Sequence, residues 1–188
     1  FYQKLIMPFF SVVIPTFNQC NYLKKAIESV VRQQYKNYEI IIIDNNSKDE
    51  TRKVIKSFKS KKIVYRKINN KGIIAKSRNL GIKIAKGKWI ALLDSDDFWH
   101  KDKLKDVFNI IKNKKKIDVI CNDKIVSYDN TKVKKIYRYG PYKTNFYEYL
   151  LKNGNRVSTS ASVVKKYFLD KNHIQYNENK KFVTTEDY

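Results

Sequence analysis

Residues 89–99 read Trp-Ile-Ala-Leu-Leu-Asp-Ser-Asp-Asp-Phe-Trp. The part from Trp89 to Leu93 is apolar throughout, and an uninterrupted apolar run of this length predicts a buried strand. The run is followed at once by a polar cluster, Asp94, Ser95, Asp96 and Asp97. Removing neighbouring carboxylates from water without partners costs several kcal/mol for each charge, so the cluster has to be exposed, paired or bound to a cation.

An acidic cluster at the end of a buried strand has two interpretations. In open α/β sheets, ligands bind at the carboxyl ends of the strands, and carboxylate oxygens there suit a hard divalent cation such as Mg²⁺ or Mn²⁺. Alternatively, the cluster is an acidic turn that caps the next helix, with Asp96 or Asp97 near the helix N-terminus. The cluster by itself does not decide between these interpretations.

The chain before this cluster alternates predicted strands and helices. Apolar runs predict the strands, and apolar residues at helical spacing predict the helices. The strands are residues 9–14, 38–43 and 62–68, and the helices are residues 22–34, a segment from residue 51, and a segment between Gly72 and Gly87. Pro15 is expected to end the first strand. The β-α-β-α-β order predicts an α/β fold with a parallel sheet and right-handed crossovers.

The chain after the cluster changes character near residue 123. The predicted elements are a helix at 101–113, a strand at 117–122, a hairpin at 124–139 around Asp129-Asn130, a helix at 146–151, a strand at 156–164 and a helix at 165–170. We predict a single domain over residues 8–188 and leave residues 1–7 outside it as an upstream remnant.

The composition restricts the class of protein. The chain has 188 residues and a formal net charge of +22, with lysines scattered along it, which indicates a solvated basic surface. Partners that suit this charge are nucleic acid, an anionic membrane surface or a phosphorylated substrate. Cys20 and Cys121 lie far apart and lack metal-binding spacing, which favours reduced thiols in the cytoplasm. No apolar run reaches the length of a membrane span.

The glycine-rich phosphate-binding motifs are missing. The five glycines fit neither G-x-G-x-x-G nor G-x-x-x-x-G-K-[ST], which excludes a typical NAD-binding Rossmann enzyme and a P-loop NTPase. A nucleotide can still bind where a divalent cation neutralises its phosphates, and the acidic cluster offers a site for that cation.

Five short motifs occur together in a fixed order. They are Ser11–Asn18 (SVVIPTFN), Ile43–Ser47 (IDNNS), Ser77–Gly81 (SRNLG), Leu93–Trp99 (LDSDDFW) and Thr185–Asp187 (TED). In these motifs the chain resembles the family 2 glycosyltransferases with the GT-A fold, a group that includes bacterial surface-polysaccharide transferases. Each motif is weak alone, but the five together are specific, and the resemblance covers residues 9–188.

The resemblance implies a Rossmann-like GT-A fold. Such a fold has a mainly parallel central sheet flanked by helices and a smaller antiparallel portion on the acceptor side. It implies a nucleotide-sugar-binding half at about residues 8–123 and an acceptor-side half at about residues 124–188. In the family, the Glu-Asp pair usually begins a region that completes the acceptor side. Since Tyr188 follows Asp187 directly and is the last residue, we expect a fragment truncated just after this motif.

The resemblance also implies roles for individual residues. Residues expected to contact the nucleotide-sugar are Pro15, Thr16 and Asn18 in the loop around the nucleotide, Asp44 at the base, Arg78 and Asn79 near the base and diphosphate, and Asp94 and Ser95 of the D-x-D motif. The metal ligand is Asp96, assisted by Asp97, and Asp187 is the catalytic base. Alternatives remain: Asp44 caps the helix after Ser47, Arg78 is an exposed helix residue, and Asp187 is a helix N-cap.

The function implied is a metal-dependent, inverting glycosyltransferase of the hexosyltransferase type. It would use Mn²⁺ or Mg²⁺ and move a sugar from a nucleotide-diphosphate sugar, such as a UDP-sugar, to a saccharide or lipid-linked acceptor in surface-glycan synthesis. We expect a cytoplasmic protein, with peripheral contact to the anionic inner face of the plasma membrane suggested by its charge. Whether it forms a homodimer is left open.

Two alternatives come from other classes of protein. A nucleic-acid-binding or nuclease-like basic protein would use the charge, but the chain lacks the usual recognition signatures, so no nucleic-acid partner is expected. A sugar nucleotidyltransferase would share the fold class. It usually has a glycine-rich loop near its N-terminus, where this chain has Pro15–Asn18 without a glycine.

Overall fold

The computed structural model describes residues 7–114, 116–127, 134–140, 145–154 and 157–182. The strands are β1 (Phe10–Thr16), β2 (Tyr38–Asp44), β3 (Ile63–Lys67), β4 (Trp89–Leu92), β5 (Val119–Cys121), β6 (Lys124–Ser127), β7 (Lys134–Tyr137) and β8 (Ser162–Lys165). The helices are α1 (Cys20–Val31), α2 (Thr51–Ser57), α3 (Ile74–Ile84), α4 (Lys103–Asn113), α5 (Phe146–Asn153) and α6 (Lys166–Lys171), with short 3-10 helices η1 (Thr159–Ala161) and η2 (Lys180–Phe182).

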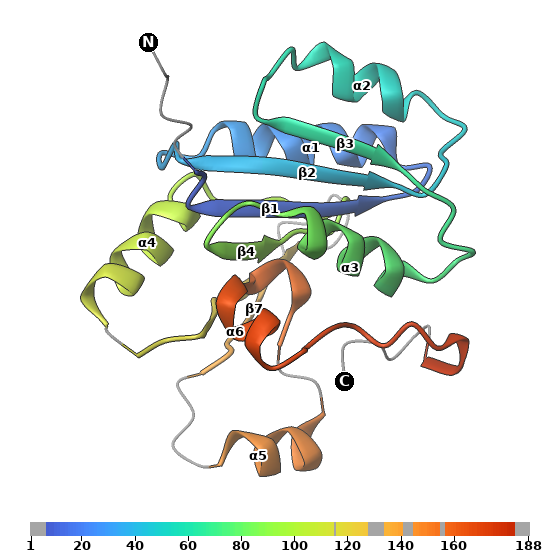
Figure 1. Ribbon diagram of the computed structural model, residues 1–188. Coiled ribbons are helices and arrows are strands. Elements are labelled where there is room, and N and C mark those ends of the chain that lie inside the picture. The colour runs from blue at the N-terminus through green and yellow to red at the C-terminus, as the bar shows by residue number, and fades with distance from the viewer. Residues whose placement is uncertain (1–6, 115, 128–133, 141–144, 155–156, 183–188) are drawn as a thin grey trace.

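The central sheet has six strands in the order β3-β2-β1-β4-β8-β5. Figure 1 shows β3, β2, β1 and β4 side by side in that order. Strands β1 to β4 are parallel, as the β-α-β order predicts, and β8 is antiparallel to both of its neighbours. The register pairs Thr16 with Asp44, so the carboxyl ends of β1 and β2 lie side by side. The predicted α/β fold with a mainly parallel sheet is confirmed.

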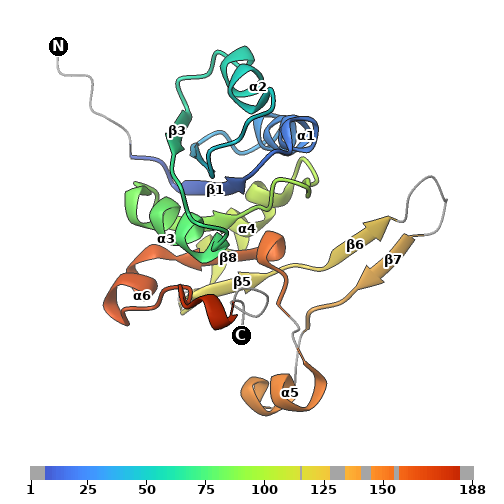
Figure 2. The same cartoon turned by 90° about the vertical axis from the view of Figure 1, so that its right-hand side faces the viewer.

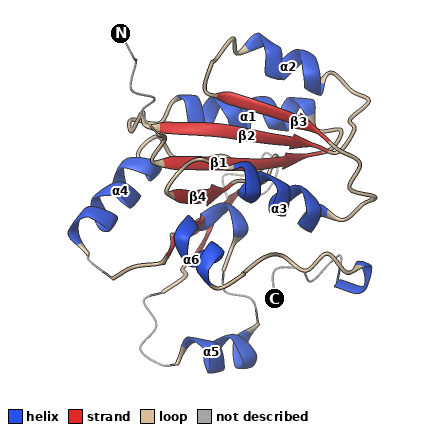
Figure 3. Ribbon diagram, in the orientation of Figure 1, coloured by secondary structure: helices blue, strands red, loops and turns tan. Residues whose placement is uncertain are grey.

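Helices cover both faces of the sheet (Figure 3). Successive side chains of a strand point to opposite faces. Val12 and Ile14 therefore pack with buried residues of α1, α2 and α4, whereas Val13 packs with residues of α3 and α6. Because both of their faces are buried, β1 and β2 are mostly apolar, and their buried polar residues Ser11 and Glu39 hydrogen-bond to each other at 2.6 Å.

Pro15 does not end the first strand, and that prediction is wrong. Strand β1 continues through Pro15 to Thr16, pairing with β2 as far as Asp44. Proline removes a main-chain donor, so its position in a strand depends on whether that donor is needed. On the other side of β1, β4 pairs only as far as Val13. The main-chain nitrogen of Pro15 faces the β4 side of β1, two residues beyond the last residue that pairs with β4. No hydrogen bond between the strands is therefore lost at Pro15.

The predicted strand at 156–164 is also wrong in part. Within the described residues, Thr159–Ala161 forms η1, and only Ser162–Lys165 forms the strand β8. The Oγ of Ser162 donates to the main-chain oxygen of Ser158 at 2.8 Å, and the N–H of Ala161 donates to the same oxygen at 3.0 Å. Serine side chains that bond the nearby backbone favour a turn over a strand.

The antiparallel portion extends from the body of the sheet (Figure 2). Strands β6 and β7 pair as the predicted hairpin, and α5 follows them. The predicted hairpin turn at Asp129-Asn130 lies outside the described residues. Among the helices that are described, none is both long and apolar enough to cross a membrane.

Candidate active site

Residues 94–97, called the acidic turn below, directly follow β4 and Leu93. The N–H of Asp97 donates to the oxygen of Asp94 at 3.1 Å and closes the turn. The N–H of Asp94 donates to the Oγ of Ser160 in η1 at 3.0 Å, so a distant segment holds the start of the turn. The buried Ser95 donates through its Oγ to Gln19, in the loop after β1. The acidic turn is therefore fixed from two sides.

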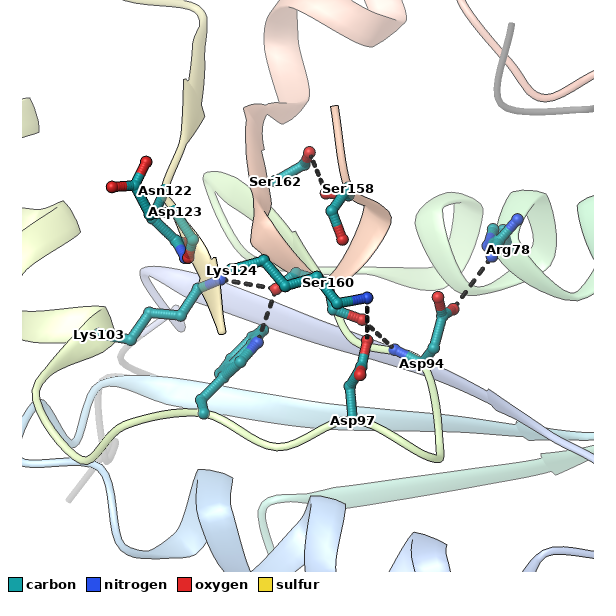
Figure 4. Close-up of polar contacts among 11 residues, drawn as sticks. Arg78, Asp94, Asp97, Lys103, Asn122, Asp123, Lys124, Ser158, Ser160 and Ser162 are labelled. Atoms are coloured by element: carbon teal, nitrogen blue, oxygen red, sulfur yellow. Dashed lines mark hydrogen bonds and ion pairs between the residues drawn. The ribbon is translucent and has the colours of Figure 1, made fainter. Parts of the chain in front are cut away.

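Asp94 forms an ion pair with Arg78 of α3, with 3.0 Å between Nη2 and Oδ1 (Figure 4). The side chain of Arg78 is 5% exposed and that of Asp94 is 28% exposed. Burial raises the pKa of Asp94, the Arg78 charge opposes this shift, and Asp97 and Asp96 add to it. The alternative that Arg78 is an exposed helix residue is wrong, because its guanidinium orients a carboxylate of the acidic turn.

Asp96 and Asp97 are the more accessible carboxylates of the acidic turn. Asp96 is exposed, and Asp97 is half-buried with its Oδ2 3.8 Å from Nζ of Lys124. Among the described residues, no group of three or more His, Cys, Asp or Glu side chains is placed to hold a metal ion. Mg²⁺ is usually held by one or two carboxylates together with substrate phosphates. The donor set therefore fits a cation that arrives with a diphosphate and does not fit a preformed protein cage.

Asp44 is 2% exposed at the end of β2. Its Oδ1 accepts hydrogen bonds from the N–H and the Oγ of Ser47 at 2.9 and 2.6 Å, and its Oδ2 accepts one from Tyr65 at 2.7 Å. Burial and Asp44 together raise the pKa of Tyr65 to about 12. Helix α2 begins only at Thr51, whose N–H is bonded by Asp49, so the alternative that Asp44 caps this helix is wrong.

The loops after β1 and β2 are tied together beside Asp44. Asn18 has a positive φ of 51°, which lets its N–H donate to Ser47 Oγ at 2.9 Å while its Oδ1 accepts from the N–H of Lys48 at 2.8 Å. Thr16 is 5% exposed, and its hydroxyl has no hydrogen-bond partner among the described residues. A buried hydroxyl without a partner costs free energy. Thr16 is therefore a buried polar group at this edge whose hydroxyl the described residues leave without a hydrogen bond.

Asn79 lies next to Arg78 but makes contacts with a later segment. Its Nδ2 donates to the main-chain oxygen of Tyr176 at 2.9 Å and to Glu178 at 2.8 Å, and its Oδ1 accepts the N–H of Tyr176 at 2.9 Å. The ring of Tyr176 lies 5.2 Å from the Arg78 guanidinium. In this structure Asn79 fastens residues 176–178 to α3.

The sequence reasoning missed several residues that shape the site. Gln19, Tyr65, Ser160 and Tyr176 each contact a predicted site residue that is distant in the chain. No local pattern marks them, because strand ends and acidic clusters indicate only the residues that carry the chemistry. Asp187, the predicted base, lies outside the described residues.

A family model described as glycosyl transferase family 2 matches residues 11–171. The chain belongs to this family. Among its relatives, an uncharacterized glycosyltransferase of Rickettsia felis is 50% identical over 95 residues, which are 50% of this chain and 16% of the relative. The Escherichia coli protein UDP-Glc:alpha-D-GlcNAc-diphosphoundecaprenol beta-1,3-glucosyltransferase WfaP is 38% identical over 109 residues, which are 58% of this chain and 43% of WfaP.

Solved structures share the fold. S. aureus TarS residues 1–349 in complex with UDP gives a TM-score of 0.76 at 22% identity, over 95% of this chain and 52% of that one. The Pyrobaculum calidifontis mannosyltransferase PcManGT in complex with GDP-Man and Mn²⁺ gives 0.67 at 14% identity, over 93% of this chain and 49% of that one. At these identities the likeness concerns the fold alone.

The predicted family and the GT-A fold are confirmed. Family 2 membership favours glycosyl transfer over the nucleic-acid-binding and nucleotidyltransferase alternatives. The matches span between 14% and 62% of the length of eight curated relatives, so those relatives contain substantial further sequence.

Proposed function

We propose that this domain binds a UDP-sugar with a divalent cation at the carboxyl edge of β1, β2 and β4 and transfers the sugar to a saccharide or lipid-linked acceptor. The observation that carries the proposal is the convergence at this edge of the buried Asp44, the acidic turn and the buried Thr16, whose hydroxyl has no hydrogen-bond partner in the part of the chain that the structure describes. A UDP-sugar is supported by the UDP named in the WfaP activity and by the UDP and UDP-GlcNAc complexes of TarS.

Each residue has a role that suits its chemistry. A carboxylate accepts hydrogen bonds only, so Asp44, oriented by Ser47 and Tyr65, suits an N–H group of the base. Asp94, oriented by Arg78, suits the ribose hydroxyls. Asp96 and Asp97 would hold the cation, which neutralises the diphosphate and stabilises the departing nucleotide when it is bound. A cation is supported by the Mn²⁺ in the PcManGT complex.

The transfer itself needs a proton acceptor. The acceptor oxygen forms a bond to the anomeric carbon as the bond from that carbon to the diphosphate oxygen breaks, and the hydroxyl proton passes to a carboxylate. We assign this base role to Asp187, on the resemblance of Thr185–Asp187 to the family motif. A single in-line displacement gives inversion at the anomeric carbon.

Thermal and chemical unfolding with UDP, GDP or CDP, each with and without Mn²⁺, tests the donor site. At about 100 times its Kd, a bound nucleotide stabilises the native state by about 2.7 kcal/mol. We expect this shift with UDP and Mn²⁺ together and its loss in Asp96→Ala. Asp106→Ala, an exposed aspartate on α4, is the matched control and keeps the shift. Stabilisation by duplex DNA and by none of the nucleotides would refute the proposal.

We further propose peripheral contact with an anionic membrane leaflet. The support is the net charge of +22 and the diphosphoundecaprenol acceptor named for WfaP, which is lipid-linked. We expect the protein to sediment with vesicles that contain an anionic lipid, to stay in solution with neutral vesicles, and to be released by salt because surface charges are screened. Equal sedimentation with both kinds of vesicle would count against this contact.

A further inference from the structure

Lys103, the first residue of α4, has a buried amino group to which the proposed transfer gives no role. The residue is 8% exposed. Its Nζ donates a hydrogen bond to the main-chain oxygen of Ser160 at 2.7 Å and lies 4.3 Å from the centre of the Trp99 ring. Burial lowers the pKa of Lys103 to about 7, while Cys121 and Asp97 oppose this shift. A buried ammonium costs free energy, so packing alone does not explain a lysine here.

Ser160 joins Lys103 to the acidic turn. Its main-chain oxygen accepts two hydrogen bonds, from Lys103 Nζ and from Trp99 Nε1, each at 2.7 Å. Its Oγ accepts the N–H of Asp94 at 3.0 Å. Figure 4 shows Lys103 and Asp94 meeting at Ser160. Ser160 is 57 residues from Lys103 and 66 residues from Asp94 in the chain, so a single residue of η1 links α4 to the start of the acidic turn.

A second lysine near the acidic turn is held much less firmly. Lys124 lies 3.8 Å from Asp97, and its side chain is 35% exposed. An exposed ion pair at this distance contributes little, because solvent screens it and the side chain loses entropy when it is fixed. Of these two lysines, Lys103 is therefore the one with a fixed position, held by its hydrogen bond to Ser160.

We propose that Lys103 is a positioning residue of the donor site, which holds the acidic turn through Ser160 in the place that the cation and the diphosphate require. The proposal rests on the proposed function, because it assigns Lys103 to the same site. Lys103 acts through Ser160, and Asp96 and Asp97 remain the residues that would bind the cation.

The direction of the effect separates this role from a simple effect of charge. An ammonium near Asp97 repels a divalent cation, so removing the charge alone would strengthen cation binding. If removal of Lys103 instead lets the acidic turn move from its position, cation binding becomes weaker. If Lys103 were purely structural, its removal would leave the affinity for the cation and for the nucleotide unchanged and would alter only the free energy of unfolding.

The experiment measures the affinity of UDP by calorimetry, with and without Mn²⁺, in wild-type protein and in Lys103→Met. Methionine fills a similar volume, and Trp99 still donates to the Ser160 oxygen, so the variant leaves this acceptor paired. We expect the unfolding free energy without ligand to be unchanged or higher. The affinity for UDP with Mn²⁺ is expected to fall about tenfold, since hydrogen bonds from charged groups contribute on the order of this factor.

Two further variants complete the test. Ser160→Ala keeps the charge of Lys103 but removes the Oγ that accepts the Asp94 N–H, and we expect the same loss of affinity with Mn²⁺. It also tests the proposal if Lys103→Met does not fold. Lys105→Met removes an exposed lysine of the same helix and is the matched control, with wild-type affinity.

The outcomes distinguish this inference from the proposed function. If wild-type protein binds no nucleotide with Mn²⁺, the proposed function itself fails. If wild-type protein binds and the affinity of Lys103→Met is equal or tighter, the positioning role is overturned. If Lys103→Met does not fold, unchanged affinity in Ser160→Ala overturns it.

Discussion

Gly81→Ala is expected to lower the free energy of unfolding by about 2–3 kcal/mol, which is the opposite of the usual effect in a helix. Alanine is favoured over glycine in a helix interior by about 1 kcal/mol. Here α3 packs directly on β1, and a Cβ on Gly81 would overlap Cγ1 of the fully buried Val13. Valine is stiff at χ1, so Val13 cannot move aside without shifting the strand.

Denaturant unfolding of Gly81→Ala, with Lys83→Ala as a matched control, measures this effect. Lys83 is exposed on the same helix, and its replacement is expected to change stability by about 0.5 kcal/mol or less. In the double variant Val13→Ala/Gly81→Ala, the removed methyl groups leave room for the new one. The combined loss should then be smaller than the sum of the two single losses. A gain in stability for Gly81→Ala alone would mean that α3 does not pack on β1 as described.

Elements with a strong local pattern could be predicted from the sequence. Strands β1, β2 and β4 are largely apolar because they are buried on both faces, and polar residues gather where they end, at the edge of the sheet. The position of β8 could not be predicted in this way. It is a short strand that inserts antiparallel between β4 and β5, and its place depends on pairing with strands more than 40 residues earlier in the chain.

Long-range hydrogen bonds also set the limits of helices. Gln33, which is fully buried, accepts the N–H of Leu104 in the first turn of α4, and Asp49 accepts the N–H of Cys20 at the start of α1. Neither acceptor belongs to the helix that it caps. The predicted start of α1 at residue 22 is therefore two residues late, since the cap comes from the loop after β2.

The candidate site likewise combines residues that a local sequence pattern predicts with residues that only long-range contacts bring together. Asp44 and the acidic turn were predicted because strand ends in a parallel sheet meet at one edge. Their partners Tyr65 and Ser160 are ordinary residues in sequence, and only the folded chain brings them to the carboxylate and the turn that they orient. Asn79 is predicted from its motif to contact the ligand, and its hydrogen bonds to Tyr176 and Glu178 are likewise evident only in the folded chain.

Arg78→Met is expected to lower the free energy of unfolding by about 2–4 kcal/mol at neutral pH. Breaking a buried ion pair by removing one partner typically costs about 3–5 kcal/mol, and the 28% exposure of Asp94 places the loss towards the lower end. The contact between the guanidinium and the Tyr176 ring is lost as well. Arg66→Met, at an exposed position, is the matched control and should be close to neutral.

The pH dependence identifies the cause of this loss. Burial, Asp97 and Asp96 all raise the pKa of Asp94, and Arg78 opposes them, so its removal raises this pKa further. Above the unfolded pKa of about 3.9 and up to the folded value, the native state binds more protons than the unfolded state, and stability falls as pH rises. The loss of unfolding free energy in Arg78→Met, relative to wild type, should therefore be larger at about pH 7.5 than at about pH 4.5. Adding Asp94→Asn removes the charge and should abolish this difference, whereas a deficit independent of pH would mean that Arg78 stabilises the fold by packing and not by pairing with Asp94.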